Sequence, residues 1–335
     1  MEKILIVTCK NDTHPNSVIE LLNKKGIPFF RLNTESLLTD YSFAWCCTEN
    51  GDVQFTITDD SNGKTINNSE IHSVWYRRPI APEELKYSYD EKVDYHNLKE
   101  AKSFYFYLMY YLSDFYSIGN HFRDKYANSK FVQHQLAGKL GMKMPMMCIS
   151  NNKNLLSQAM REYESLIIKP LGDYSIWYDG DNTYQFYATK VQTDELLANK
   201  EESFSQTVNF CENYIEKKYE LRITVMGNHV FACKLDSQRQ KNDTGKIDWR
   251  QGYENNLVHQ MIECPQNVSR FCKDYLSHLK LNFGCFDFIV TPEDDYVFLE
   301  CNPNGQWGWI EDDTAAPMSE ALVDCLIHYR HPLDE

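Results

Sequence analysis

The chain has 335 residues, enough for two or three packed lobes, and 42% of them are hydrophobic. Its formal net charge of −14 at pH 7 argues against a nucleic-acid partner, because nucleic acids bind to basic surfaces. No apolar run approaches the length of a membrane span, and eleven cysteines without a CxxC pair are typical of reduced thiols. We therefore expect a globular, cytoplasmic protein without a membrane segment.

Residues 1–125 predict a leading α/β lobe. A strand, a helix and a second strand follow each other, and this β-α-β order indicates a small parallel sheet. Two Asn-Gly dipeptides are typical of hairpin turns and bracket a further strand. These elements are expected at Ile4–Val7, Asn16–Lys25, Pro28–Leu32, Val53–Thr58 and Val74–Tyr76. A helix rich in Phe and Tyr is expected at Asp94–Tyr116, and its spacing indicates a core or subunit-contact face.

The strand at Val74–Tyr76 runs into two adjacent arginines, Arg77 and Arg78. Such a pair is either solvated or, in an acidic protein, a place to hold a carboxylate-rich peptide through charge-assisted hydrogen bonds. The second interpretation is a hypothesis for one of the two side chains.

Residues 126–210 predict a second lobe with two notable lysines. Lys130 opens a helix expected at Phe131–Leu140, and Lys169 ends a buried strand expected at Leu166–Pro170. A lysine at the end of an apolar strand, fixed by a following proline, is poorly explained by packing. It fits a point charge aimed at phosphate, and the alternative is a lysine at the rim of the sheet.

A β-hairpin is predicted near the end of the chain. Two apolar runs, Cys285–Val290 and Tyr296–Leu299, flank the polar turn Pro292–Asp295. If Val290 lies near Val297 across the hairpin, this contact determines which residues of the two strands lie opposite each other.

That register places Asp287 opposite Glu300, and strand alternation puts both on one face with Asn302. The opposite face is expected to carry Phe286, Phe288 and Leu299. Oxygen-only ligands select a hard cation, so Mg²⁺ bridging phosphate oxygens is the natural occupant. A solvated acidic hairpin is the alternative, but the aromatic neighbours indicate burial, and unpaired buried carboxylates are costly.

An Asp, a hairpin and then Glu-x-Asn-Pro resembles the magnesium-binding end of ATP-grasp ligases. The longer run Phe298–Trp307, Phe-Leu-Glu-Cys-Asn-Pro-Asn-Gly-Gln-Trp, is similar to that of the graspetide ligases, which make microviridin-type peptides. The resemblance covers nearly the whole chain. It implies an α/β ATP-grasp fold behind a small parallel-sheet pre-ATP-grasp lobe, with lobes at 1–125, 126–210 and 211–335.

The resemblance also implies roles for individual residues. The metal ligands, for two Mg²⁺ ions, would be Asp287, Glu300 and Asn302. Lys130 would contact ATP at the α-phosphate, and Lys169 would contact its phosphates. The adenine hinge would be Asn213, Tyr214 and Ile215. Glu220 would bind the ribose, and Lys234 would be a further ATP contact. Arg250 would stabilise charge on the transferred phosphoryl group, with a surface arginine as the alternative. Arg222 alternates with two apolar residues on its strand and is expected to face the nucleotide.

The segment after Lys169 departs from the family pattern. Many ATP-grasp enzymes carry a glycine-rich flap there, but Leu171–Gly180 holds only two glycines, so phosphate cradling by its backbone is in doubt. In graspetide ligases the corresponding hairpin and helix are associated with the leader peptide. Tyr174–Lys190 and Thr193–Lys200 are the matching segments, with Asp173 and Tyr174 as expected substrate contacts.

The implied reaction is ATP-dependent macrocyclisation of a ribosomally made precursor peptide with a leader and a Thr/Ser- and Asp/Glu-rich core. A side-chain carboxylate of Asp or Glu becomes an acyl phosphate, and Thr, Ser or Lys then displaces phosphate to close an ω-ester or ω-amide. Trp307 and Trp309 either exclude water from this intermediate or pack in the core, and Glu311 is a candidate base. The family resemblance also implies a homodimer.

Two other functions remain open from the sequence. The first is an intermolecular ATP-grasp ligase that adds an amino acid or peptide, and the second is a nucleotide-responsive binding protein without turnover. No GxSxG, P-loop or GxGxxG motif occurs in the chain, so the chemistries of those motifs have no support.

Overall fold

The computed structural model describes residues 2–172, 176–179, 182–240, 243–251 and 257–328. Its N-terminal lobe is built on a parallel sheet in the order β2-β1-β6-β7. The strands are β1 (Lys3–Thr8), β2 (Phe29–Asn33), β6 (Ile71–Tyr76) and β7 (Ser117–Ile118). Helix α1 (Pro15–Lys25) joins β1 to β2 and ends at Gly26, whose φ of 67° suits glycine. The predicted β-α-β unit is confirmed.

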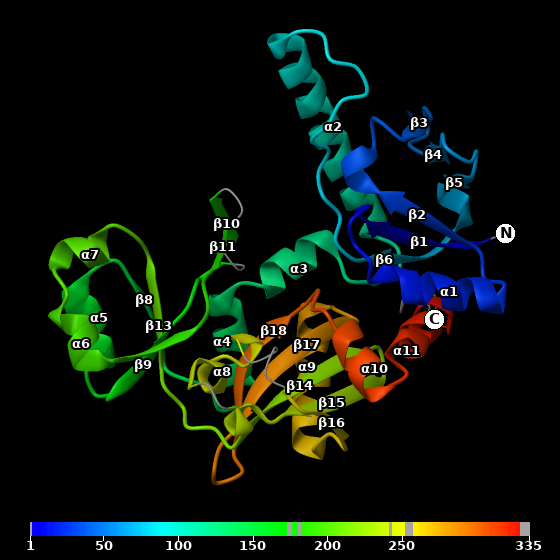
Figure 1. Ribbon diagram of the computed structural model, residues 1–335. Coiled ribbons are helices and arrows are strands. Elements are labelled where there is room, and N and C mark those ends of the chain that lie inside the picture. Colours follow the sequence, from blue (N-terminus) through cyan, green and yellow to red (C-terminus); the bar gives the residue numbers. More distant parts are fainter. Residues whose placement is uncertain (1, 173–175, 180–181, 241–242, 252–256, 329–335) are drawn as a thin grey trace.

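An antiparallel sheet and a long helix complete this lobe (Figure 1). The elements are η1 (Thr34–Ser36), β3 (Tyr41–Cys47), β4 (Val53–Asp59), β5 (Thr65–Asn67), η2 (Asn68–Glu70) and α2 (Glu91–Leu112). Both predicted Asn-Gly turns are present, with positive φ at Gly51 and Gly63. Helix α2 ends at Leu112 and not at the predicted Tyr116, and its last two turns bury Tyr105, Leu108 and Met109 against the sheets.

The middle lobe holds an antiparallel sheet in the order β12-β9-β13-β8. Two helices lead into it, α3 (His121–Ala127) and α4 (Lys130–Lys139). The other elements are β8 (Met147–Ser150), α5 (Lys153–Met160), β9 (Ser165–Ile168), β10 (Ile176–Asp179), β11 (Asn182–Gln185), β12 (Thr189–Gln192), α6 (Thr193–Ala198), α7 (Glu201–Ser205) and β13 (Asn209–Asn213). This lobe stands apart in Figure 1 and has its own small core around Leu156, Leu166 and Phe204.

The C-terminal lobe is built on a five-stranded antiparallel sheet in the order β16-β15-β14-β17-β18. Its elements are β14 (Tyr219–Met226), β15 (His229–Leu235), η3 (Ser237–Arg239), α8 (Asp243–Ile247), β16 (His259–Ile262), α9 (Gln266–Leu279), β17 (Phe283–Val290), β18 (Tyr296–Asn302), α10 (Gly308–Thr314) and α11 (Met318–His328). Helix α9 packs its apolar stripe on one face of the sheet. The polar stretch 236–245 contains η3 and the start of α8.

The N-terminal and C-terminal lobes share one core. Helix α11 buries Leu322, Val323 and Leu326 in a cluster that also contains Ile4 and Ile6 of β1. Ser73 of β6 donates a hydrogen bond to the carbonyl of Leu326 at 2.7 Å, which ties the end of the chain to the first sheet. Among the described helices, none is both long and apolar enough to cross a membrane.

The β17–β18 hairpin differs from its predicted register near the turn. Val290 pairs with Tyr296, and Ile289 pairs with Val297, yet Asp287 still lies opposite Glu300. A β-bulge at Leu299 absorbs the extra residue. The predicted pairing of the two carboxylates is therefore confirmed.

The same bulge overturns the prediction for Leu299. This side chain was expected on the core face with Phe286 and Phe288, but it lines the cleft described next. Strict alternation fails here because a bulge places two consecutive residues opposite one.

Candidate active site

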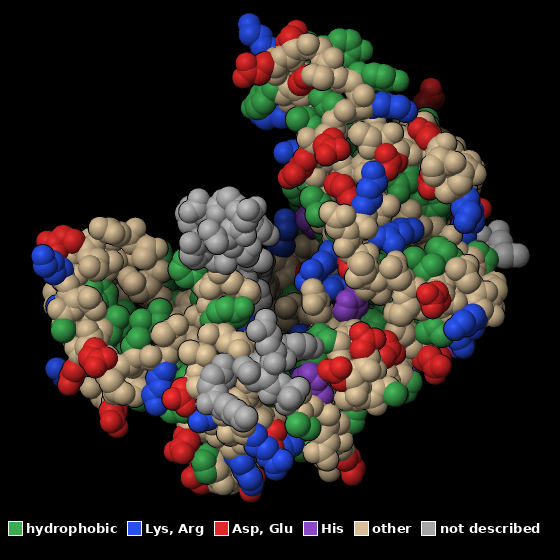
Figure 2. Space-filling model, viewed as in Figure 1, with side chains coloured by type: hydrophobic (Ala, Val, Ile, Leu, Met, Phe, Trp, Pro, Cys, Tyr) green, Lys and Arg blue, Asp and Glu red, His purple; other side chains and the backbone are tan. Residues whose placement is uncertain are grey.

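A cleft of about 530 Å³ lies between the middle and C-terminal lobes. Figure 2 shows the molecule hollowed at this place. Its walls come from the start of α4, the strands β9 and β13, and the strands β14, β17 and β18. Of the predicted site residues, the cleft brings together Arg78, Lys130, Lys169, Asn213, Tyr214, Ile215, Glu220, Arg222, Arg250, Asp287, Glu300 and Asn302.

Each carboxylate of the hairpin is held by a cation from another element. The guanidinium of Arg222, on β14, lies 2.7 Å from the carboxylate of Asp287, because these residues are cross-strand neighbours. The ammonium of Lys130, at the start of α4, lies 2.5 Å from the carboxylate of Glu300. The side chains of Asp287 and Glu300 keep 19% and 30% of their surface exposed, so both still open onto the cleft.

These pairs set the charge state of the hairpin. Burial raises the pKa of Asp287, although Arg222 opposes this shift. Burial would also raise the pKa of Glu300, but Lys130 and Lys169 outweigh it and lower the pKa to about 2. Burial would lower the pKa of Lys130, and Glu300 more than offsets this, so the pKa rises. The Lys130–Glu300 pair is charged at neutral pH.

The middle lobe contributes the second lysine. Lys169 follows β9 and pairs with the buried carboxylate of Glu212 at 2.8 Å. The hinge that continues from β13 is partly used by the protein itself, since the backbone amides of Asn213 and Tyr214 donate to the carbonyls of Met146 and Ser165. These two amides are therefore already engaged within the protein.

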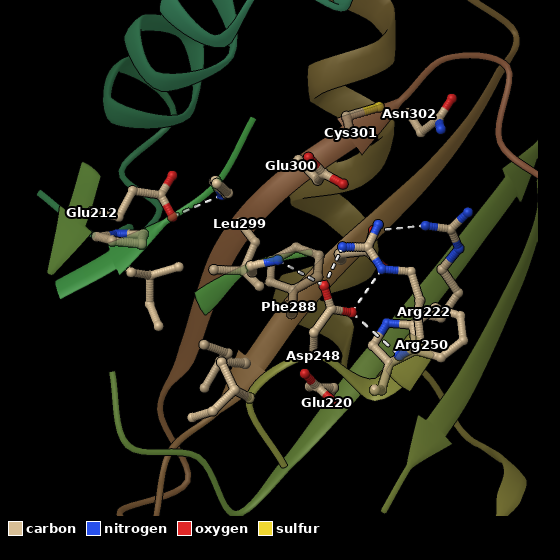
Figure 3. A pocket seen from close by; sticks show the side chains of 18 of the residues that line it. Glu212, Glu220, Arg222, Asp248, Arg250, Phe288, Leu299, Glu300, Cys301 and Asn302 are labelled. Carbon is tan, nitrogen blue, oxygen red and sulfur yellow. Dashed lines mark hydrogen bonds and ion pairs between the residues drawn. The ribbon is translucent and has the colours of Figure 1, made fainter. Parts of the chain in front are cut away.

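The floor of the cleft holds two further ion pairs. Lys217 pairs with Glu220 at 2.5 Å and donates to the carbonyl of Ile247, and burial raises the pKa of Glu220. Arg250 donates to both oxygens of Asp248 at 2.7 and 2.5 Å. Burial raises the pKa of Asp248 to about 6 and lowers the pKa of Arg250. Figure 3 shows Asp248, Arg250 and Glu300 within the same cleft.

The adjacent arginines separate into two environments. Arg78 is exposed at the cleft, where both terminal nitrogens lie within 3.1 Å of the Gln306 amide oxygen when that amide is oriented to accept. Arg77 is only 1% exposed and donates to the backbone and side-chain oxygens of Asn304. Of this pair, only Arg78 is accessible to a peptide, and a substrate contact at Arg77 is excluded by its burial.

Three other predicted residues lie outside the cleft. Lys234 sits 3.7 Å from Asp236 and above the ring of Tyr219. Trp307 is 1% exposed in the shared core, which favours core packing among the two alternatives, whereas Trp309 lines the cleft. Glu311 accepts hydrogen bonds from the amide and hydroxyl of Ser319, which gives it a structural role at the start of α11. Asp173 and Tyr174 lie outside the described residues.

Several cleft residues were not predicted from the sequence. They are Asn128, Glu212, Lys217, Asp248, Trp249 and Gln306. A weak signal existed for Glu212, because a charged residue inside the strand Asn209–Asn213 requires a partner when that strand is buried.

The oxygen donors of the hairpin fit a magnesium site. Among the described residues no group of three or more His, Cys, Asp or Glu side chains forms a metal-binding cluster. A metal at this hairpin would therefore use Asp287, Glu300 and the amide oxygen of Asn302. Such a sparse protein set suits Mg²⁺, which keeps waters and substrate phosphates as its other ligands.

Comparisons with known proteins agree with this architecture. Residues 3–122 match the MvdD pre-ATP grasp domain. No curated protein matches the chain. The structure is similar to the Chryseobacterium gregarium RiPP-associated ATP-grasp ligase in complex with ADP and a leader and core peptide, with a TM-score of 0.87 and 26% identity over 97% of this chain and 96% of that one.

Two macrocyclases of Microcystis aeruginosa are also similar. MdnC, bound with the precursor peptide MdnA, has a TM-score of 0.81 and 26% identity over 98% of this chain and all of that chain (100%). MdnB has a TM-score of 0.77 and 24% identity over 98% of this chain and 100% of that chain, and this similarity shows the fold. The predicted resemblance to ATP-grasp ligases of the graspetide type, and the predicted fold with its pre-ATP-grasp lobe, are confirmed.

Proposed function

We propose that this chain, whose fold is that of the ATP-grasp ligases, closes rings in a ribosomally made precursor peptide at the expense of ATP. A carboxylate of Asp or Glu in the peptide would attack the γ-phosphate to give an acyl phosphate and ADP. A Thr or Ser hydroxyl, or a Lys amine, would then displace phosphate and leave an ω-ester or ω-amide. The observation that carries the proposal is that Lys130, Lys169, Arg222 and Arg250 line one cleft together with the acidic hairpin.

Each cleft residue has a physical part in this reaction. Lys130 and Lys169 are point charges for phosphate oxygens, and Arg250 stabilises charge that develops on the transferred group. The hinge at Ile215 and the apolar wall at Leu299 suit the base, and Glu220 suits the ribose. Asp287, Glu300 and Asn302 would hold Mg²⁺, which neutralises phosphate charge when bound. We propose two ions, as the family resemblance implies.

The substrate side rests on Arg78. Its exposed guanidinium at the cleft suits a carboxylate of the peptide core, whereas the buried Arg77 does not. The hairpin Tyr174–Lys190 and the helix that begins at Thr193 are proposed to contact the leader, as in the graspetide ligases. The division into lobes at 1–125, 126–210 and 211–335 and a homodimer are part of the same proposal.

The test uses ATP, Mg²⁺ and a peptide with a leader and a Thr/Ser- and Asp/Glu-rich core. The parent protein should form ADP and remove one water per ring from the peptide, seen by mass spectrometry. Asp287→Asn and Glu300→Gln should abolish both products, because each removes a metal charge. The matched control is Asp295→Asn, which changes an exposed acid in the turn of the same hairpin.

The outcome also separates the alternatives. A peptide that gains the mass of an added residue would favour an intermolecular ligase. Nucleotide binding without ADP, with every peptide offered, would favour a binding protein without turnover. Unchanged ADP formation in both hairpin variants would refute the assignment of the metal site.

A further inference from the structure

The carboxyl ends of β1 and β6 meet the loop that follows β18. In the order β2-β1-β6-β7 the chain leaves β1 toward one edge and β6 toward the other, so the switch point lies between them. Open parallel sheets bind ligands at such points. Here the loop that follows β18 brings Asn304 against Arg77, which follows β6.

Arg77 is held between the first and last lobes. Its guanidinium lies 3.6 Å from the carboxylate of Asp12, which follows β1. It donates to the carbonyl of Asn304 at 2.9 Å and to the side-chain oxygen of Asn304 at 2.6 Å. The side-chain amide of Asn304 donates back to the carbonyl of Arg77. This reciprocal pair joins residues 227 positions apart in the chain.

Asn304 connects this contact to the metal hairpin. Its backbone amide donates to the side-chain oxygen of Asn302 at 3.0 Å. That oxygen is the one Asn302 would offer to a cation, and one hydrogen bond leaves it a second lone pair. Arg77 therefore orients the amide of Asn302 through one intermediate residue.

A second contact from the same lobe secures the far end of the loop. The ring nitrogen Nε2 of His14 accepts from the backbone amides of Gly308 at 3.1 Å and Trp307 at 3.4 Å. The ring of His14 also meets Trp307 edge-on, with 4.8 Å between centroids. The loop that carries Asn302, Gln306 and Trp309 along the cleft is thus fixed at both ends by the N-terminal lobe.

We propose that Arg77 and Asn304 are positioning residues of the metal site, through which the N-terminal lobe sets the affinity of the cleft for Mg²⁺. Neither side chain lines the cleft. Groups that orient a metal ligand change metal affinity on the order of 10- to 100-fold when they are removed. This inference rests on the proposed role of the hairpin as a metal site.

The test measures binding without the peptide or turnover. Mg²⁺ is titrated into the protein with ADP, and binding is followed by calorimetry and by the fluorescence of Trp249 and Trp309, which line the cleft. Asn304→Ala and Arg77→Lys should each raise the half-saturating Mg²⁺ concentration on the order of tenfold. The affinity for ADP without metal should stay within about twofold of the parent, since the hinge is untouched.

Arg31→Lys is the matched control. Arg31 lies in the same lobe and donates to Asn33 and to the carbonyls of Cys9 and Asp12, and among the described residues it forms no hydrogen bond with the loop. It should lower stability but leave the Mg²⁺ requirement unchanged. If Arg77→Lys does not fold, Asn304→Ala decides alone, because it truncates a half-buried turn residue and leaves Arg77 its pairing with Asp12.

Three results would overturn the inference. The first is an unchanged half-saturating Mg²⁺ concentration in folded Asn304→Ala. The second is a loss of metal-free ADP affinity in Asn304→Ala as large as its loss of Mg²⁺ affinity. The third is a rise in the half-saturating Mg²⁺ concentration of Arg31→Lys as large as that of Asn304→Ala. A parent protein that binds no Mg²⁺ with ADP would instead overturn the proposed metal site itself. Restoration of the parent Mg²⁺ requirement by Asn304→Asp, which keeps the acceptor for Arg77, would support the inference further.

Discussion

Arg222 reaches Asp287 only because the chain leaves room beside it at Gly305. A Cβ added to Gly305 would lie 2.8 Å from a terminal nitrogen of Arg222 and 2.5 Å from the Cβ of Cys285. Both distances are closer than side-chain atoms tolerate. Glycine is required at this position by the approach of its neighbours, and this explains physically one glycine of the run Pro-Asn-Gly-Gln-Trp.

Gly305→Ala should therefore lower the free energy of unfolding by about 1–3 kcal/mol, as overpacking does in buried sites. Urea denaturation measures this change. Gly172→Ala is the control, because a Cβ at that glycine meets no atom within 4 Å. Equal stability of the two variants would mean that the backbone beside Arg222 shifts freely.

His121 is a buried histidine at the junction of the first two lobes. Its side chain accepts a hydrogen bond from, or donates one to, the hydroxyl of Tyr76, and it is 8% exposed. Burial lowers its pKa from 6.5 to about 4. Between these values the unfolded chain binds a proton that the native protein does not, so stability is lost as the pH falls from 6.5 to 4.

The stability of the parent relative to His121→Gln should consequently rise between pH 4 and 6.5, by at most about 3 kcal/mol. The difference between the two proteins isolates this histidine from the nearby Asp124. His278→Gln, at an exposed position, is the control. A parallel pH profile for parent and His121→Gln would contradict the assignment.

The residues that could be predicted are those with a chemical reason visible in the sequence. Lys169 ends an apolar strand, and Asp287 and Glu300 lie on either side of a turn that the sequence predicts. Glu212 was missed because its ion pair with Lys169 forms only when separate strands pack together. Asp248 was missed because no sequence pattern shows that it pairs with Arg250, two residues further on. The sequence could not tell which of Arg77 and Arg78 is buried, because the partner of Arg77, Asn304, lies far away in the sequence.

At the scale of elements, strands and helices were predicted close to their observed positions, and irregular features were not. The bulge in β18 shifts the register by one residue and turns Leu299 into the cleft. The alternation of apolar and polar residues along one strand cannot reveal a bulge, because the extra residue is defined by its pairing with the neighbouring strand. Helix α8 has five residues without an apolar repeat, so no pattern in the sequence predicts it.

The bulge gives β18 an apolar contribution to the cleft. Leu299 lines it with Phe288, Ile289 and Ile167, as the labelled side chains of Figure 3 show in part. Leu299→Ala should raise the dissociation constant of ADP about tenfold, because roughly 1.5 kcal/mol of apolar contact is lost. Equilibrium fluorescence titration measures it. Val208→Ala, exposed and outside the cleft, should bind as the parent does.

At the scale of the molecule, the first and last lobes share a core, whereas the middle lobe has a small core of its own. The core shared by the first and last lobes includes Leu322, whereas the middle lobe relies on Leu156 and its few neighbours. The three-lobe expectation did not anticipate that the last helix, α11, would fuse the first and last lobes. That contact joins segments with no common pattern in the sequence.

Leu322→Ala should destabilise the first and last lobes together, by about 2–5 kcal/mol, because it empties a fully buried site. Hydrogen exchange should rise in β1, β6 and β14 together. Leu156→Ala should speed hydrogen exchange only in β8, β9 and β13. Leu155→Ala, which changes the exposed neighbouring residue, is the control. Faster exchange throughout the molecule in Leu156→Ala would contradict two independent units.

The acids of the cleft are already matched by internal cations, and this bears on how a charged ligand enters. Lys130, Lys169 and Arg222 would each have to leave a carboxylate before they could bind a phosphate. The carboxylates of the hairpin that lose their cation could then bind the metal. Binding of Mg²⁺ and nucleotide then exchanges one set of ion pairs in the cleft for another, and few ions are taken up from the solution or released to it. Such a site should admit Mg²⁺ and nucleotide together more readily than either alone, and added salt should weaken their joint entry only slightly.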